Sequence, residues 1–386
     1  MKLLCLSACA LALSAQTASD LFDATKLNDI RLTFAPGDWE KLRETYLEDT
    51  YYKVAFRWRD AEIVTIGLRS RGNGSRNAAK PGLKLDFNQY VKDQTFAGFK
   101  SLVLDNLVQD RTMMAERLSM QLFRRMGIPA PRVAHVRLFV NDKFEGLYTL
   151  VEPVDKTFLK THLGEDSGQL FDYEWVSDYN FEYLGADTAQ YAPAPFKPKT
   201  NEKNPDLKTL VDFIRTINEA PDHQFAGALT EFLDAEKYLD YLAVETFLAE
   251  IDGQLGDWGL NNFYLYRLAD KRQFVFLPWD KDVTFSKIDR SAWHNSGKNV
   301  LSRRLLAIPA YQSHFTRAMQ QVMELAGGPG GWLDTEITNI KLQIQADAAI
   351  DAIKPYSTNE FYEGVRFLHE FTRDRPGFVR TELGVR

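Results

Sequence analysis

Short runs of alternating apolar and polar residues fill the chain from about Leu27 to Leu150 and predict strands. Val64–Arg69 alternates in this way. In the segment that ends at Phe87, period two places positions 83, 85 and 87 on one face and Lys84 on the other. We therefore expect Lys84 to project from a strand whose opposite face is in the core.

Beyond this region the pattern changes. A predicted hairpin has strands at 133–140 and 146–151 with a turn at 141–145, and residues 170–204 are aromatic, proline-containing and loop-like. Apolar residues at helical spacing then predict mainly helices. The expected helices are 110–126, 205–219, 234–250, 301–325, 333–353 and 359–370. The pattern predicts an α+β fold with two lobes, a β-rich N-lobe at 19–152 and a mainly helical C-lobe at 153–386.

One segment of the C-lobe, residues 250–285, gathers acidic and amide side chains around a predicted hairpin with strands at 263–267 and 274–277. Asp252 and Asn262 precede the first strand, and Asp280 follows the second. In an antiparallel pair the start of one strand lies beside the end of the other, so these side chains should lie close together. Oxygen ligands of this kind suit Mg²⁺, which is usually held by one or two carboxylates together with substrate phosphates.

A loop rich in glycine, serine and arginine at 69–76 precedes the Lys84 strand. It offers backbone N–H groups and the side chains of Arg71 and Arg76 to an anion, and Lys84 could reach the same anion as a point charge. A solvated turn with an exposed lysine is the structural alternative. The loop is not a Walker loop, because no Gly-Lys-Ser/Thr follows it.

Composition argues against one class of partner and indicates where the protein is located. With 47 Lys and Arg against 53 Asp and Glu, the net charge of −6 argues against a nucleic-acid partner. Residues 1–18 resemble a secretory signal, with lipidation at Cys9 as a less favoured alternative. Both cysteines lie in that segment, so the mature chain should carry no disulfide, and no later stretch is apolar enough for a membrane span. We expect a secreted or cell-envelope protein, and a monomer.

Five segments together resemble the spore-coat protein H (CotH) type of atypical secreted protein kinase. They are 69–76 with 80–87, 140–152, Ile-Asp at 251–252, the Asn-Asn-Phe-Tyr-Leu-Tyr run at 261–266 and Leu-Pro-Trp-Asp-Lys-Asp at 277–282. The resemblance implies a divergent kinase-like fold, with ATP and Mg²⁺ or Mn²⁺ as cofactors. It also implies phosphorylation of serine or threonine hydroxyls on extracellular or surface proteins, with Ser-rich proteins as the expected substrates.

Residue by residue, the resemblance matches Lys84 to the nucleotide-phosphate lysine, Asp252 to the catalytic aspartate and Asp280 to the metal-binding aspartate. From the residues alone, Asn262 would hold the metal together with Asp280, and Asp252 would either orient the acceptor hydroxyl as base or share the metal. Glu152 falls where the chain would pass between the lobes, near the nucleotide.

The chain departs from the family pattern at two positions. Glu250 stands where the family usually has Asn, and Lys281 occupies a usually apolar position after Asp280. Asp257 offers an alternative alignment for Asp252. Two other functions therefore stay open: a kinase-like surface or extracellular binding protein without catalysis, and a metal-dependent hydrolase that uses the aspartates at 252, 257, 280 and 282.

Overall fold

The computed structural model describes residues 16–385. Both cysteines and nearly all of the expected signal lie outside the described residues, so the signal stays a prediction. The short helix α1 (Ala18–Leu21) begins where that segment was expected to end, and the Thr17 side chain caps it. Among residues 16–385, no helix is both long and apolar enough to cross a membrane.

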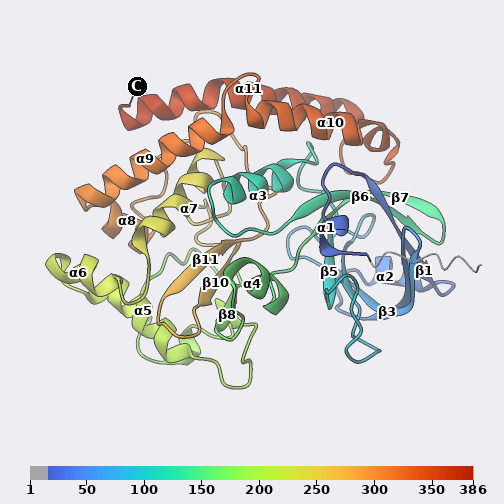
Figure 1. The fold of residues 1–386 in the computed structure, drawn as a ribbon, viewed down its shortest axis with the longest axis horizontal. Coiled ribbons are helices and arrows are strands. Elements are labelled where there is room, and N and C mark those ends of the chain that lie inside the picture. The colour runs from blue at the N-terminus through green and yellow to red at the C-terminus, as the bar shows by residue number, and fades with distance from the viewer. Residues whose placement is uncertain (1–15, 386) are drawn as a thin grey trace, which may run out of the picture.

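The first half of the chain forms a closed β-barrel, drawn from blue to green in Figure 1. Its strands follow the order β1-β2-β3-β4-β5-β7-β6, and parallel pairing of β1 with β6 closes the ring. The bounds are β1 (Asn28–Phe34), β2 (Tyr52–Trp58), β3 (Ala61–Arg71), β4 (Gly82–Asp86), β5 (Ser101–Asp105), β6 (Val133–Val140) and β7 (Lys143–Val151). The short helix α2 (Asp38–Glu44) lies between β1 and β2.

The two faces of β4 separate the barrel interior from the rest of the molecule, as the period-two pattern predicted. Leu83 and Leu85 are fully buried in the barrel core. On the other face Lys84 lies in register with Arg69 of β3 and Val103 of β5, and Val103 lies in register with Val151 of β7. Val103 and Val151 belong to the core of the helical part. The outer face of β3, β4, β5 and β7 therefore looks toward the second half of the chain.

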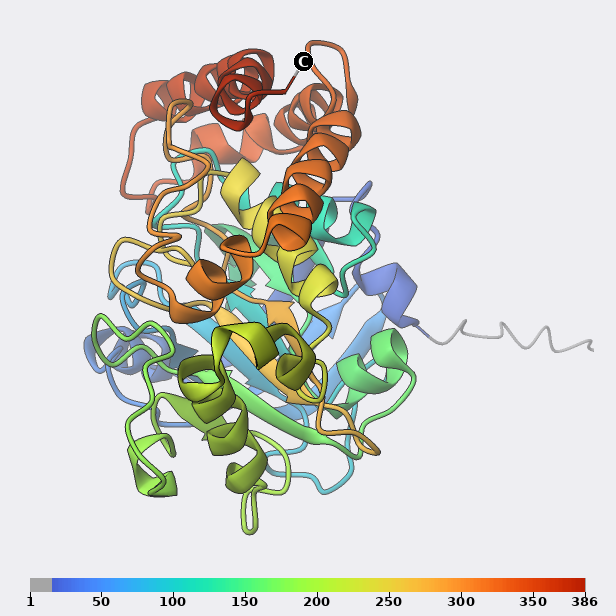
Figure 2. The ribbon, with the colours of Figure 1, turned by 90° about the vertical axis from the view of Figure 1, so that its left-hand side faces the viewer.

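Helices dominate that second half and cover the barrel from one side (Figures 1 and 2). Their bounds, together with α3 from the first half, are α3 (Ala115–Arg125), α4 (Lys156–Leu163), α5 (Leu207–Glu219), α6 (Asp222–Leu229), α7 (Ala235–Phe247), α8 (Val300–Leu306), α9 (Pro309–Ala326), α10 (Trp332–Ile350) and α11 (Thr358–Leu383), with a 3-10 turn at Thr188–Gln190. The long helices α9, α10 and α11 run across the top of the molecule in Figure 1. The predicted α+β class, with a β-rich half followed by a mainly helical half, is confirmed.

A second, smaller sheet lies among the helices, with the order β11-β10-β8-β9. The predicted hairpin is its centre, as β10 (Phe263–Arg267) and β11 (Phe274–Pro278). The loop-like prediction for 170–204 is wrong at both ends, because β8 (Gln169–Tyr173) and β9 (Phe196–Pro198) extend the hairpin into this sheet. Most aromatic residues in this segment are core residues, with Trp175 an exposed exception, and Tyr173 stacks on Phe263 with ring centroids 4.7 Å apart.

Several predicted boundaries shift for local reasons. The helix expected from 110 begins at 115, because the Asp110 carboxylate first accepts the backbone N–H groups of Thr112, Met114 and Ala115. The hairpin turn expected at 141–145 is shorter, since Asn141 and Asp142 both take positive φ and β7 starts at 143. The helix expected at 301–325 is two helices, with Pro309 opening α9.

Candidate active site

The loop that follows α7 carries Asp252, and two amide side chains hold its carboxylate. Asn261 Nδ2 donates to both Asp252 oxygens at 3.0 Å, and Asn262 Nδ2 donates to Asp252 Oδ2 at 3.0 Å. The helix ends at Phe247, earlier than the predicted residue 250, and Ala249 turns the chain with a φ of 52°. The carboxylate is thus fixed by hydrogen bonds that leave its charge in place, which suits a group that orients or deprotonates a hydroxyl.

The β10–β11 pair brings Asn262 and Asp280 to one end of the hairpin, as the sequence predicted. Phe263 lies in register with Pro278, and the Trp279 N–H donates to the Asn262 carbonyl at 3.2 Å. Asn262 and Asp280 both adopt the left-handed backbone region, with φ of 57° and 50°. The left-handed region is energetically unfavourable for residues other than glycine. Such strained residues cluster at functional sites, where the surrounding structure enforces the conformation.

Asp280 belongs to an acidic cluster of which the sequence analysis named Asp280 and Asp282 but not Asp105 and Glu116. The other members are Asp105 at the end of β5, Glu116 in the first turn of α3, and Asp282 after β11, and these three are nearly fully buried. Burial, and then Asp105, raise the pKa of Asp280 to about 6. Burial raises the pKa of Glu116 and Asp282 well above the usual range, with Asp105 and Asp280 adding to the effect in both. The cluster is short of positive charge.

Arg71, on the outer face of the barrel, is the cation that acts on this cluster from the barrel side. Arg71 Nη1 lies 3.9 Å from Asp105 Oδ2, and the Arg71 guanidinium lies 5.7 Å from the centre of the Trp279 ring. Arg71 lowers the pKa of Asp280 and of Glu116. Lys84 shares the outer face with Arg71, since its register partner is Arg69, two residues before Arg71. The Lys84 ammonium lies 3.3 Å from Asp86 and is partly exposed.

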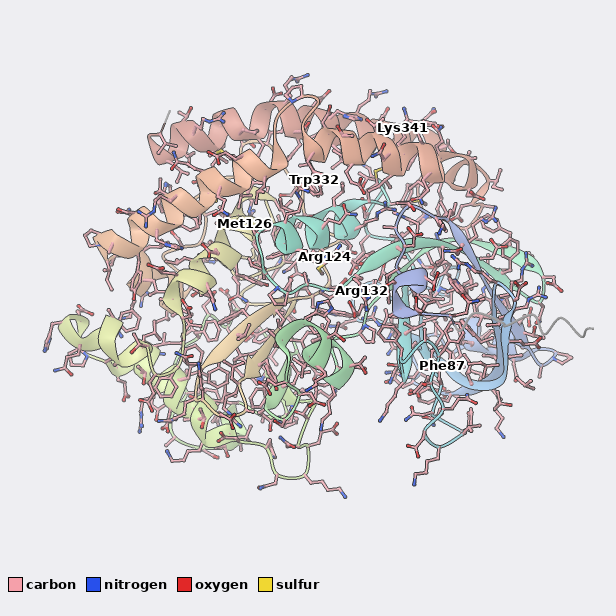
Figure 3. The ribbon with its side chains drawn as sticks, viewed as in Figure 1. Phe87, Arg124, Met126, Arg132, Trp332 and Lys341 are labelled. Atoms are coloured by element: carbon pink, nitrogen blue, oxygen red, sulfur yellow. The ribbon has the colours of Figure 1, made fainter. Side chains whose placement is uncertain are left out.

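Two other residues proposed for nucleotide binding are engaged within the fold. Arg76 bonds to Asp49 and to the backbone carbonyls of Gly72 and Tyr46, so it anchors the glycine-rich loop. The Glu152 carboxylate is fully buried and accepts hydrogen bonds from Arg132, which lies on the side of the barrel that faces the helices (Figure 3), and it contacts His162 at 3.2 Å. His162 and Arg132 outweigh burial and lower the pKa of Glu152 to about 2.

Asp257, the alternative to Asp252, faces other partners. Its carboxylate lies 2.9 Å from Arg290 Nη2 and 2.7 Å from His294 Nε2, and these groups outweigh burial and lower its pKa. It is not among the groups that act on Asp280, whereas Asp252 is. The geometry therefore favours Asp252 as the partner of Asp280.

The two departures from the family pattern face one another. Lys281 is fully buried and points into the helical half, where its Nζ lies 2.6 Å from Glu245 Oε1 of α7 and 3.9 Å from Glu250 Oε2. The positive charge of Lys281 is thus matched by two carboxylates. Burial, partly offset by Lys281, raises the pKa of Glu250 to about 7.

The side chains near Asp280 offer oxygen atoms to a divalent cation. The carboxylates of Asp105 and Asp280 raise the pKa of Glu116, and Glu116 Oε2 is buried with no hydrogen-bond partner. An amide that donates its nitrogen to Asp252, as Asn262 does, keeps its oxygen for another ligand. No group of three or more His, Cys, Asp or Glu converges on one point in residues 16–385. A magnesium ion bound through one or two carboxylates and phosphates needs no such cage.

Comparison with known proteins decides the family. The family model described as CotH kinase protein matches residues 68–379, which include the glycine-rich loop, the acidic cluster and the hairpin. The chain belongs to the CotH kinase protein family. The resemblance seen in the sequence is confirmed.

Named relatives extend this CotH kinase match over most of the chain. It is 24% identical to the inner spore coat protein H of Bacillus subtilis over 91% of this chain and 96% of that protein. It is 23% identical to Invasin CotH7 of Rhizopus delemar over 70% of this chain, which spans 45% of the invasin. Among solved structures, the Helicobacter pylori proinflammatory kinase CtkA aligns over 81% of this chain and 94% of that chain, at 9% identity and a TM-score of 0.32. That score is too low to carry an argument.

Sequence reasoning missed three residues of this CotH kinase site, for the same reason. Asp105 and Glu116 lie in a strand and a helix that read as ordinary core elements. Arg375, fully buried in α11, donates to the carbonyls of Thr246 and Phe247 and so satisfies the end of α7 just before the site. Tertiary packing brings each of these residues to the site. Only Glu116, an acidic residue in the first turn of α3, could have been suspected from the local sequence.

Proposed function

We propose that this CotH kinase family member is an active, secreted or cell-envelope protein kinase that transfers the γ-phosphoryl group of ATP to serine or threonine hydroxyls of extracellular or surface proteins. Family membership supports a kinase-like protein, and the finer activity rests on the site. The observation that carries it is the acidic cluster of Asp105, Glu116, Asp280 and Asp282, short of cations and next to the fixed carboxylate of Asp252. The names of the relatives, spore coat protein and invasin, support an extracellular or envelope setting.

In this proposal the residues divide the work between the two halves. Asp280 and the Asn262 amide oxygen would hold Mg²⁺ or Mn²⁺, with Asp252 close enough to share it. The ion, when bound, neutralises charge on the phosphates and on the transferring group. Arg71 and Lys84 would pair with phosphate oxygens from the barrel side, because both project from the face that looks toward Asp280. Asp252, fixed by Asn261 and Asn262, would orient the acceptor hydroxyl and take its proton.

The contacts of Glu152 and Arg76 change the roles that the sequence suggested for them. The Glu152 side chain is occupied by Arg132 and His162, so a role toward the nucleotide would have to come from its backbone. Arg76 would act by holding the loop that carries Arg71. A hydrolase built on Asp252, Asp257, Asp280 and Asp282 loses support, since Asp257 is paired with Arg290 and His294.

The proposal is tested by incubating the purified mature protein with labelled ATP, Mg²⁺ or Mn²⁺ and a serine-rich acceptor. We expect label transfer by the wild type and none above background by Asp280→Ala, because a lost metal ligand removes several kcal/mol of transition-state stabilisation. Chelation should stop transfer by the wild type. Equal labelling by both proteins would remove Asp280 from the mechanism. A wild type that binds a surface partner tightly but neither binds nor uses ATP would support the binding-protein alternative.

A further inference from the structure

Beneath the proposed catalytic loop lies a buried ion cluster made of Glu245, Glu250 and Lys281. Glu245 and Lys281 are almost fully excluded from solvent, and so is Glu250. Each comes from a different segment: α7, the loop that leads to Asp252, and the residue directly after Asp280. Lys281 therefore sits where the two proposed site segments meet the helix that supports them.

Hydrogen bonds connect this cluster directly to the catalytic loop. Glu250 Oε1 accepts the N–H of Asp252 at 2.8 Å, and Glu245 Oε2 accepts the N–H of Gln254 at 2.8 Å. Glu245 Oε1 receives the Tyr241 hydroxyl at 2.9 Å and Lys281 Nζ at 2.6 Å. The two carboxylates thus grip the backbone on either side of Gly253.

The packing leaves this arrangement little freedom. A Cβ placed on Gly253 would meet Glu250 Cγ at 2.7 Å and the Glu245 carboxylate oxygens at 2.8 Å. Two buried carboxylates this close repel each other, and Lys281 is the cation that both face: 2.6 Å from Glu245 and 3.9 Å from Glu250. Without the ammonium, the carboxylates would separate or lose their charge, and the backbone amides they hold would move with them.

We propose that Lys281 is a positioning residue: through Glu245 and Glu250 it sets the conformation of residues 250–254 and ties Asp252 to the Asp280 segment. This goes beyond the proposed kinase activity, since it concerns the loop whether or not ATP is used. It also gives the two departures from the family pattern one explanation, because Glu250 and Lys281 compensate each other. Of the other charges nearby, Asp252 is held on its other side by Asn261 and Asn262. Arg290, which lines the same cavity as Glu245 and Glu250, is paired with Asp257.

The test replaces each of two buried lysines in turn and compares amide hydrogen exchange in the two variants of the mature protein. Lys281→Met removes the proposed positioning cation. Lys80→Met is the matched control, because Lys80 is also fully buried, its Nζ lies 2.7 Å from Asp351, and the hydrogen bonds of this pair involve none of residues 250–254. We expect exchange at Asp252 and Gln254 to become at least about tenfold faster in Lys281→Met, since the amides lose their fixed acceptors. Lys80→Met should lower the melting temperature without changing exchange at those two amides.

A compensated variant separates positioning from general loss of stability. Lys281→Met combined with Glu245→Gln and Glu250→Gln removes all three charges but keeps side-chain oxygens that accept the same amides. Its exchange at Asp252 and Gln254 should return toward that of the wild type, a non-additive result expected of groups that act together. Equal acceleration by the two lysine variants, or no recovery in the compensated one, would overturn the proposal.

A further variant keeps the test decisive if Lys281→Met does not fold. Glu250→Ala leaves the Lys281–Glu245 pair intact and removes only the acceptor of the Asp252 N–H. Exchange at Asp252 should still accelerate, and an unchanged rate would again overturn the proposal. Because exchange needs no substrate, an inactive wild type would count against the kinase and leave this outcome readable. With an active wild type, Glu250→Ala should lower kcat more than it raises KM for ATP.

Discussion

Two groups of buried carboxylates in this molecule differ in how they are paired. Glu152, at the end of β7, is surrounded by cationic partners, and Arg132 with His162 lowers its pKa to about 2. Asp280, with Asp105, Glu116 and Asp282 nearby, faces mainly other carboxylates, and burial raises its pKa to about 6. The ionised Glu152 carboxylate therefore stabilises the fold. The ionised carboxylates around Asp280 lower its stability, which is typical of a functional site that binds a cation.

The largest effect is expected at Asp252, whose carboxylate is fixed by two amides and belongs to neither group. Asp252→Asn should reduce phosphoryl transfer by a factor of about 10² to 10⁴, the range typical of a lost general base. The two amides that hold residue 252 can still donate to an Asn oxygen, so the melting temperature should change little. The measurement is initial transfer rate together with thermal unfolding. A rate close to that of the wild type would exclude Asp252 as the base.

Removing the charge of Glu152, which has cationic partners, should lower the stability of the fold. Glu152→Gln should lower the free energy of unfolding by about 3 kcal/mol at pH 7, because a shift from 4.5 to about 2 corresponds to roughly that amount. A lowered carboxyl pKa stabilises the fold above the unfolded value, and this contribution disappears as pH falls from about 4.5 toward 2. Denaturant unfolding at pH 7 and pH 3 checks the prediction. The difference between the variant and the wild type should shrink at pH 3.

The cation-poor group should respond with the opposite sign. Asp280→Asn should raise the free energy of unfolding of the metal-free protein at pH 7 by on the order of 1–3 kcal/mol, since it removes a carboxylate whose ionised form is disfavoured. The cost of ionising Asp280 is present above pH 6 and absent below about 4, so the gain should fade at low pH. Added Mg²⁺ with nucleotide should stabilise the wild type and not the variant. A variant less stable than the wild type at pH 7 would contradict the cation-poor interpretation.

The smallest effect is expected at Asp257. Asp257 is partly exposed, its partner Arg290 is buried, and Arg290 also donates to the Leu255 carbonyl, so Asp257→Asn should cost on the order of 1 kcal/mol of stability. Transfer activity should stay within about twofold of the wild type. The same transfer assay and thermal unfolding serve as the measurement. A loss of activity as large as that of Asp252→Asn would exchange the roles of the two aspartates.

Local pattern predicted well wherever a residue's partners lie in its own element or in the next strand. The alternation around Lys84 placed it opposite the barrel core, and the hairpin brought Asn262 to the Asp280 end, because both follow from strand geometry. The helix predicted from residue 234 begins there, because the Asp234 carboxylate accepts the Lys237 N–H at 3.2 Å and caps α7. The strands β8 and β9 were missed, because their apolar residues are spaced irregularly and pair only with the hairpin already in place.

Backbone periodicity and short-range strand pairing predict the α+β class and the meeting of Asn262 with Asp280, and the motifs along the chain indicate the family. Which charges meet across the chain depends on the packing of distant elements. The tertiary structure surrounds Glu152 with Arg132 and His162, gathers Asp105 and Glu116 around Asp280, and turns Lys281 into the helical half against Glu245. Such charges are brought together by the packing of elements far apart in sequence, and a buried carboxylate's energy depends on those neighbours.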